Sequence, residues 1–233
     1  MRTQSEVATD RLREQIIRGE HKPGSHIQEQ TLSDNLGVSR TPVRTALNTL
    51  ANEGLLEYVA KRGYRVREVS LSEISDAYEV RATLEGMGCR LVAERGLDRA
   101  GERYLRSIVE EMEEIIEGGS NRDFDRDRWR ELNHRFHMKI LDTADNDLLK
   151  RLVTETARLP LATLRTIAYW GERETVLMVW RSHIDHVYIL DALARGQAFR
   201  AEARMREHIQ VGGQLVHDQY VAAQEPDPLA IAR

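Results

Sequence analysis

The chain has 233 residues and a formal net charge of −4, and 31% of its residues are charged but only 6% aromatic. This length allows two modest domains, and the composition favours helices over sheets. A single cysteine excludes an internal disulfide, and no apolar run approaches the roughly 20 residues that span a bilayer, so we expect a cytoplasmic protein without a membrane segment.

The N-terminal part of the chain predicts three short helices. Apolar residues recur at helical spacing over 4–18, 29–36 and about 39–53. Gly37 stops the second helix, and Ser39 is a candidate N-cap for the third. The separation between the last two helices is therefore only a few residues long.

Two short β-prone stretches follow, over 55–59 and 64–69, and a basic turn that contains Arg62 and Gly63 lies between them. Alternating apolar residues around such a turn predict a β-hairpin. Three short helices followed by a basic hairpin are typical of a winged helix-turn-helix, which we expect over residues 1–69.

The remainder of the chain has a different character. We expect an all-α helical bundle over residues 70–224 and a loose tail over 225–233, so that the fold class is mainly α. Helices are predicted over 71–95, 98–117, 123–144, 146–168, 173–195 and 197–222. Residues 1–69 carry 11 Lys and Arg against 9 Asp and Glu, whereas the rest carries 23 against 29, an asymmetry that fits a DNA-facing first part.

The segment around the third helix has the pattern of a DNA-reading motif. A tight turn at Gly37 allows the next helix to protrude into the major groove. Its first turn offers side chains that bond phosphates or base edges, namely Ser39, Arg40, Thr41 and Arg44. The alternative is that the two arginines lie on an ordinary solvated helix face.

The segment PGSHIQEQTLSDNLGVSRTPVRTALNTLANEGLLEYVAKRGYRV closely resembles the winged-helix domain of the GntR family of regulators, over about residues 8–67. The resemblance places DNA contacts at Gln30, Arg40, Thr41, Arg44, Arg62 and Gly63. Thr45 and Gln30 depart from residues that are common in the family, which affects the operator sequence. Two such winged-helix domains related by a two-fold axis match the two halves of a pseudo-palindromic operator in double-stranded DNA. We therefore expect a homodimer.

Several histidines of the C-terminal part lie on apolar helix faces. Asn133 and His137 are four residues apart and share a face, while His186 and His208 each lie on the apolar stripe of another helix. A helical bundle can bring them together in its core, where three imidazoles and an oxygen donor suit a divalent ion of the Zn, Ni or Mn type. The alternative is that each is a hydrogen-bonded core residue.

Three segments of this part resemble the FCD sensor domain of the FadR branch of the family: ISDAYEVRATLEGMGCRLVAERG, LNHRFHMKILDTADNDLL and HVYILDALARGQAFRAEARMREHI. The resemblance implies a metal site at Asn133, His137, His186 and His208. Asparagine stands where many members have aspartate, so a bound metal is expected to be labile or absent. His134 and His183 are weaker candidates.

Arg81 lies on an apolar stripe of the first long helix, and a buried guanidinium must be paired. Either it forms a structural ion pair, with Glu85 one turn away as a candidate partner, or it clamps the carboxylate of a ligand. Trp170 and Trp180 are candidates for lining the same effector site, with ordinary packing as the alternative.

These observations predict a ligand-responsive DNA-binding transcriptional regulator, a repressor that a small organic carboxylate releases from its operator, and not an enzyme. The alternative is a metal-dependent hydrolase or lyase that uses the histidines, but the sequence contains no HExxH motif, nucleophile elbow or phosphate loop. An architectural DNA-binding protein would explain neither Arg81 nor the histidines.

Overall fold

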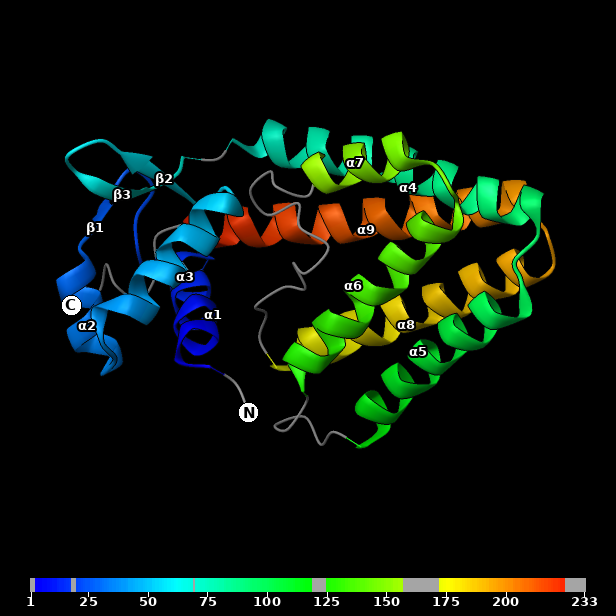
Figure 1. The fold of residues 1–233 in the computed structure, drawn as a ribbon, viewed down its shortest axis with the longest axis horizontal. Coiled ribbons are helices and arrows are strands. Elements are labelled where there is room, and N and C mark those ends of the chain that lie inside the picture. The colour runs from blue at the N-terminus through cyan, green and yellow to red at the C-terminus, as the bar shows by residue number, and fades with distance from the viewer. Residues whose placement is uncertain (1–2, 18–19, 69, 119–124, 157–171, 225–233) are drawn as a thin grey trace.

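A small N-terminal head lies at one end of a larger helical body in the computed structural model, which describes residues 3–17, 20–68, 70–118, 125–156 and 172–224 (Figure 1). Head and body denote the described residues before and after position 69. Residue 69 itself is outside the described residues, so the domain boundary there stays a prediction. No helix within the described ranges is long and apolar enough to cross a membrane.

The head contains the expected three helices and hairpin, together with one additional short strand. Its elements are α1 (Gln4–Ile17), β1 (His26–Ile27), α2 (Glu29–Leu36), α3 (Arg40–Asn52), β2 (Leu56–Val59) and β3 (Gly63–Val66). The three strands form an antiparallel sheet in the order β1-β3-β2. The sequence did not reveal β1, because two residues are too few to show an alternating pattern.

The turn between α2 and α3 forms because Gly37 adopts a left-handed backbone, with φ at +65°. Ser39 then begins α3 in an extended conformation, as expected of an N-cap, but its side chain makes no capping hydrogen bond. Its hydroxyl is exposed. Backbone hydrogen bonds and a hydrogen bond from the Ser33 hydroxyl to the Val38 carbonyl therefore hold the turn, and the Ser39 hydroxyl remains available to another partner.

The regular elements of the body are all helices over its described residues. Its elements are α4 (Leu71–Arg95), α5 (Arg99–Gly118), α6 (Arg126–Thr143), α7 (Asp147–Thr156), α8 (Glu172–Ala194) and α9 (Ala198–Gln224). The predicted helix over 146–168 is confirmed as far as 156, and its remainder and the tail 225–233 lie outside the described residues. The first turn of α4 is fixed by a capping box between Ser70 and Glu73.

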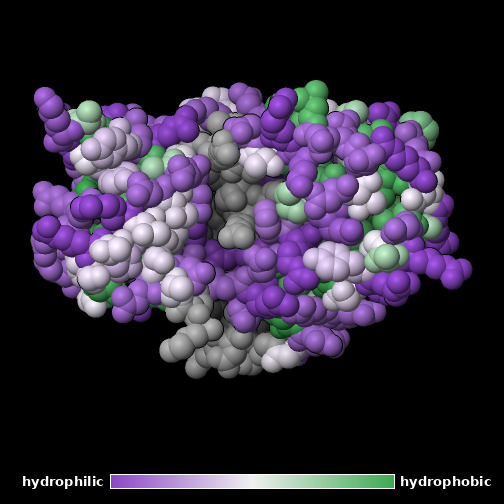
Figure 2. Space-filling model, in the orientation of Figure 1, coloured by the Kyte–Doolittle hydropathy of each residue, from purple (hydrophilic) through white to green (hydrophobic). Residues whose placement is uncertain are grey.

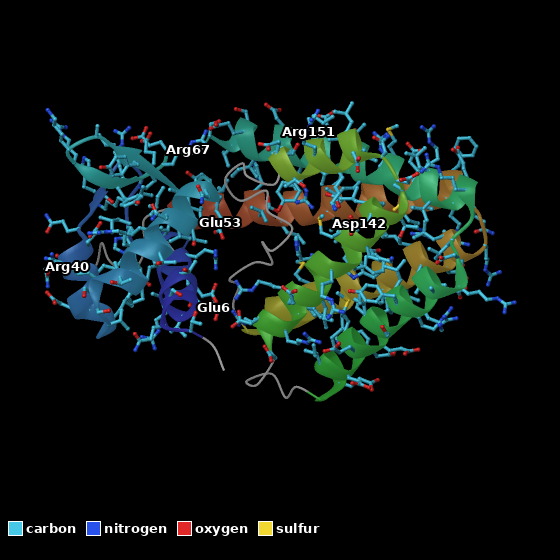
Figure 3. All side chains as sticks on the ribbon, in the orientation of Figure 1. Glu6, Arg40, Glu53, Arg67, Asp142 and Arg151 are labelled. Atoms are coloured by element: carbon cyan, nitrogen blue, oxygen red, sulfur yellow. The ribbon has the colours of Figure 1, made fainter. Side chains whose placement is uncertain are left out.

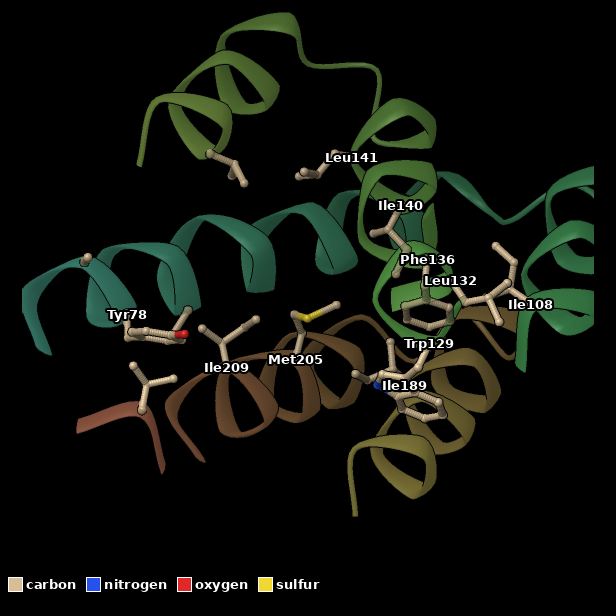
Figure 4. Packing of buried hydrophobic residues seen from close by; sticks show 14 of the residues in the cluster. Tyr78, Ile108, Trp129, Leu132, Phe136, Ile140, Leu141, Ile189, Met205 and Ile209 are labelled. Atoms are coloured by element: carbon tan, nitrogen blue, oxygen red, sulfur yellow. The ribbon is translucent and has the colours of Figure 1, made fainter. Parts of the chain in front are cut away.

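The two longest helices, α4 and α9, run side by side, and both reach toward the head (Figure 1). Gly213 allows their close approach, because a Cβ at this position would lie 2.5 Å from Cγ of Tyr78. Beyond this contact the buried side chains of α6 and α8 complete the core, with Trp129 and Phe136 among its largest members (Figure 4). The core thus surrounds the face of α6 that carries Asn133 and His137.

Ion pairs connect the head to the body. The Nη2 atom of Arg67 lies 2.6 Å from Oε1 of Glu73, beside the start of α4. On the other side, Nη1 of Arg130 on α6 lies 4.0 Å from Oδ1 of Asp10 on α1. The face of the molecule shown in Figure 2 is largely hydrophilic, so polar and charged contacts of this kind suit the junction.

Candidate DNA-reading face and buried histidine site

The residues expected to read DNA lie together on the exposed side of α3. Arg40, Thr41 and Arg44 are all exposed, whereas Val43 and Leu47 on the opposite face are buried in the core of the head. Arg40 lies at the end of the molecule farthest from the body (Figure 3). The amphipathic pattern therefore turns the basic first turn of α3 toward solvent.

Arg40 is already engaged by another residue of the predicted interface. Its Nε donates a hydrogen bond of 2.8 Å to Oε1 of Gln30 on α2, and the Gln30 amide donates in turn to Asp34 at 2.9 Å. Gln30 thus orients the guanidinium of Arg40 in the absence of DNA.

Arg44 is paired with Glu29, a residue that sequence reasoning did not select. The Nη2 and Nε atoms of Arg44 donate to the two carboxylate oxygens of Glu29 at 2.9 and 3.3 Å. The hydrogen bond from Arg44 lowers the pKa of Glu29, so the carboxylate is ionised at neutral pH. A guanidinium fork of this kind can bind guanine or phosphate, so DNA that is bound through Arg44 would have to displace Glu29 from it.

The hairpin presents further exposed groups at its tip. The side chain of Arg62 is exposed, and Gly63 has φ of +81°, a left-handed conformation that suits glycine. Tyr58 is 66% exposed and packs edge-to-face against Tyr64, with ring centroids 5.4 Å apart. Sequence reasoning overlooked Tyr58, although its outward place in an alternating strand was a usable signal.

The structure brings three of the predicted metal ligands together in the core of the body. The ring nitrogens of His137 on α6, His186 on α8 and His208 on α9 lie within 4.8 Å of one another. Asn133 is buried one turn before His137. Three helices far apart in the sequence therefore supply one cluster of donors that could hold a metal ion.

Two carboxylates that the sequence did not assign to the cluster contact the Nδ1 atoms of two of its rings. The Nδ1 atom of His137 is 2.7 Å from Oε2 of Glu85, and Nδ1 of His208 is 3.4 Å from Oδ2 of Asp185. A carboxylate on one ring nitrogen fixes the tautomer in which the other nitrogen offers its lone pair. Both contacts thus leave Nε2 as the donor atom.

His186 is the member of the cluster whose polar atoms most need a partner. Both of its ring nitrogens are buried, and neither makes a hydrogen bond within the described structure. Burial lowers the pKa of His137 and lowers that of His186 well below its ordinary value, so both rings are neutral near pH 7. Neutral, buried imidazoles with an open nitrogen are the form that binds a divalent metal.

Arg81 is buried and paired with Glu85, whose Oε1 accepts a 2.9 Å hydrogen bond from Arg81 Nε. Burial alone would raise the pKa of Glu85, but the charge of Arg81 and the contact with His137 outweigh it and lower the pKa to about 2. Glu85 is therefore an ionised bridge between Arg81 and the histidine cluster. This geometry favours the structural ion pair over the ligand clamp, which stays a prediction.

The other candidate residues lie at the margin of the cluster or outside the described structure. Trp180 is 36% exposed, and its ring lies 6.0 Å from that of His183. His183 is buried, and its Nδ1 makes no hydrogen bond in the part of the chain described. Trp170 lies outside the described residues, so its role in effector binding, like that of Trp180, stays a prediction.

Comparisons with known proteins cover both halves of the chain. Residues 4–66 match the model "Bacterial regulatory proteins, gntR family" and residues 76–211 match the FCD domain. The chain is 32% identical over 190 residues to the Nta operon transcriptional regulator of Aminobacter aminovorans, covering 81% of this chain and 83% of that protein. It is 31% identical over 202 residues to the probable D-xylose utilization operon transcriptional repressor of Paenarthrobacter nicotinovorans, covering 84% and 80%. Among solved structures, E. coli McbR/YncC matches with a TM-score of 0.63 at 21% identity and covers 94% of this chain and all of its own, which supports the fold.

Proposed function

The chain belongs to the GntR family of bacterial transcription regulators with an FCD domain, and on that premise we propose that it is a repressor of the FadR-like branch that acts in the cytoplasm. It binds a pseudo-palindromic operator as a homodimer, and a small organic carboxylate releases it. The observation that supports this most directly is that one chain combines an exposed basic turn on α3 of the head with a buried histidine cluster in the body. Membership of a family of regulators also agrees with the expectation that the chain is not an enzyme.

The effector site is assigned to the cluster of His137, His186 and His208 with Asn133 beside it. A divalent ion held there would offer a coordination position to a carboxylate oxygen. The residues of the chain fit such an ion, because one ring nitrogen of each histidine lies within 4.8 Å of the others, while Glu85 and Asp185 contact Nδ1 of His137 and of His208. Asn133 supplies a neutral oxygen, so we expect weaker retention of metal than an aspartate would give.

Metal content is the first measurement. Full-length protein equilibrated with Zn²⁺, Ni²⁺ or Mn²⁺ and then desalted is expected to retain about one ion per chain for at least one of these metals. The double substitution His137→Ala, His186→Ala is expected to abolish retention, because it removes two of the three nitrogen donors. Mass spectrometry of the metals gives the stoichiometry independently of any DNA or effector assay.

The control for this measurement is His217→Ala, since His217 also lies on α9 beside an aspartate but outside the cluster. This variant should bind metal like the wild type. If the wild type retains none of the three metals while the double variant merely unfolds more easily, the histidines are structural. The search for a ligand would then depend on Arg81 and its surroundings.

A continuous set of contacts leads from the histidine cluster to the reading helix. Arg130 lies on the face of α6 that carries Asn133 and His137, one and two turns away. Its guanidinium contacts Asp10, which pairs with Arg13 on the same helix α1. Arg13 in turn donates to both carboxylate oxygens of Glu53 at 3.0 and 2.8 Å. Since Glu53 is the C-cap residue of α3, we propose that a shift of α6 on ligand binding repositions the head through these pairs.

Breaking the contact between Arg130 and Asp10 is expected to abolish the effect of the ligand on the affinity for DNA. A panel of hydroxycarboxylates (lactate, malate and citrate) is first tested for release of wild-type protein from its operator. A compound that releases the wild type is expected to lower its DNA affinity within the 5- to 150-fold range that is usual for allosteric coupling. In Arg130→Met or Asp10→Asn, the same compound is expected to change DNA affinity by less than about twofold. Fluorescence anisotropy with a labelled operator duplex measures both affinities.

Arg135→Met serves as the matched control, because Arg135 lies on α6 but donates to Tyr104 of α5 at 3.0 Å. It should leave the response to the carboxylate intact. Retention of the full response in both Arg130→Met and Asp10→Asn would show that the signal reaches α3 by another route.

A further inference from the structure

The hairpin carries an aromatic residue, Tyr58, on the face that packs against the core of the head. In the register of β2 and β3, Tyr58 is paired with Tyr64. The next pair on the same face of the sheet is Leu56 with Val66. Leu56, Val66 and Tyr64 are buried, whereas Tyr58 is 66% exposed. Tyr58 therefore extends the core-facing side of the hairpin beyond the edge of the core, where most of its surface is open to solvent.

Tyr64 connects Tyr58 to the reading helix α3. The two rings pack edge-to-face with centroids 5.4 Å apart, and the Tyr64 hydroxyl donates a hydrogen bond to Oδ1 of Asn48. Asn48 is exposed on α3, one turn after Arg44. Burial raises the pKa of Tyr64, the charge of Glu29 raises it further and that of Arg44 lowers it, so both of these groups lie close to Tyr64. Tyr58 thus lies beside the exposed face of α3, and its contact with Tyr64 holds it there.

We infer that Tyr58 contacts DNA in addition to the residues predicted from the sequence: its hydroxyl donates a hydrogen bond to a backbone phosphate beside the groove that α3 enters. This inference rests on the proposed function. Within the described part of the chain the Tyr58 hydroxyl makes no hydrogen bond, so its proton is available to such an acceptor. Tyrosine is one of the side chains that bond phosphates, and with two side-chain torsions it loses little conformational entropy on binding.

Position and charge both favour a phosphate over a base edge as the acceptor. Helix α3 supplies the side chains that enter the major groove, so a group on the neighbouring hairpin meets the backbone that borders the groove. Lys61 and Arg62 are exposed at the turn that follows the strand of Tyr58. Glu57 points to the opposite face of the strand, where its Oε1 lies 2.5 Å from Nη2 of Arg65. A phosphate that approaches Tyr58 therefore meets a basic turn, and the adjacent carboxylate is neutralised on the other face.

Removing the hydroxyl group alone tests this contact. Tyr58→Phe keeps the ring against Tyr64 and is expected to lower affinity for the operator selected with the wild-type protein about 10-fold, the lower end of the range for a hydrogen bond to a charged group. Because a phosphate carries no sequence information, affinity for an unrelated duplex of the same length should fall by the same factor. Fluorescence anisotropy at one fixed salt concentration measures both affinities. Tyr104→Phe is the matched control: Tyr104 is a partly exposed tyrosine on α5 of the body, and both affinities should stay unchanged.

The phosphate is located by replacing each phosphate of the operator, one at a time, with an uncharged methylphosphonate. The wild type is expected to lose affinity at one phosphate per half-site where Tyr58→Phe shows no further loss, while both proteins lose affinity equally at phosphates bound by other residues. A Tyr58→Phe protein that binds both duplexes as tightly as the wild type would overturn the inference. A loss confined to the operator, or a changed base preference in a new selection, would also overturn it, because either would place the hydroxyl on a base edge.

Arg44→Ala separates this inference from the proposed function. Weaker operator binding by Arg44→Ala, together with wild-type binding by Tyr58→Phe, would leave the regulator assignment intact and remove only the Tyr58 contact. A wild-type chain that selects no operator and binds no duplex would contradict both. Equal losses by Tyr58→Phe on the two duplexes, together with a loss of operator preference in Arg44→Ala, would support both.

Discussion

Replacing Arg44 with alanine is expected to weaken binding to the operator about 10- to 100-fold, which corresponds to the roughly 1–3 kcal/mol of a bidentate arginine contact to a base. The operator is obtained by repeated selection from random 30-base-pair duplexes with the wild-type protein, and affinities are measured by gel-shift titration. The reason is that Arg44 lies in the exposed face of α3 with its guanidinium at the surface. The affinity should also fall steeply with rising salt in the wild type.

Two variants define the specificity of this result. Arg106→Ala removes an exposed arginine that is likewise paired with a glutamate, Glu102, but lies on α5 in the body, and it should not change DNA affinity. Glu29→Gln should increase affinity a few-fold, because it releases Arg44 and removes a negative charge that faces the phosphates. Unchanged affinity in Arg44→Ala would mean that α3 is not the reading helix.

The substitution Glu85→Gln is expected to reduce the free energy of unfolding by about 3–5 kcal/mol, because it removes the carboxylate that pairs with the buried guanidinium of Arg81. Urea denaturation followed by circular dichroism measures this loss. The matched control is Glu94→Gln on the same helix, where the i,i+4 pair with Arg90 is partly exposed and 3.9 Å long. An exposed pair contributes no more than about 1 kcal/mol, so the control should be close to wild type.

The double variant Arg81→Met, Glu85→Gln tests the cause of the loss. Removing both charges should recover most of the stability, since a methionine side chain needs no counter-ion and the amide oxygen introduced at position 85 still accepts from His137. A double variant as unstable as Glu85→Gln would show that packing or the His137 contact, and not the charge of Arg81, determines the effect.

The same carboxylate gives stability a defined pH dependence. Glu85 has an ordinary pKa of 4.5 and a pKa of about 2 in the folded chain. A group whose pKa is lower in the folded than in the unfolded chain stabilises the fold at pH values above its unfolded pKa. For Glu85 this contribution is about 3 kcal/mol, and it is lost as the pH falls from 4.5 toward 2. Urea midpoints measured across that range should fall more steeply for the wild type than for the double variant.

Local signals in the sequence were sufficient for the helices and for the reading motif. Gly37 ends α2 because it adopts the left-handed backbone without the steric penalty of a Cβ, and the capping box at Ser70 and Glu73 fixes the start of α4. The apolar spacing of α3 turned Arg40 and Arg44 outward, and the structure confirms both positions as exposed. Each of these features depends on residues within one or two turns of one another, so the sequence contains the whole cause.

The tertiary structure decided which charged and apolar groups meet across elements. The sequence suggested that His137, His186 and His208 face inward, but their convergence depends on how three helices pack. The same packing brings Glu85 to His137, 52 residues away. It also turns His186 inward and the Ile184 face outward on a helix that is apolar on both sides. Periodicity gives the faces of a helix, whereas only the neighbouring helices determine which face is covered and which partner each polar atom finds.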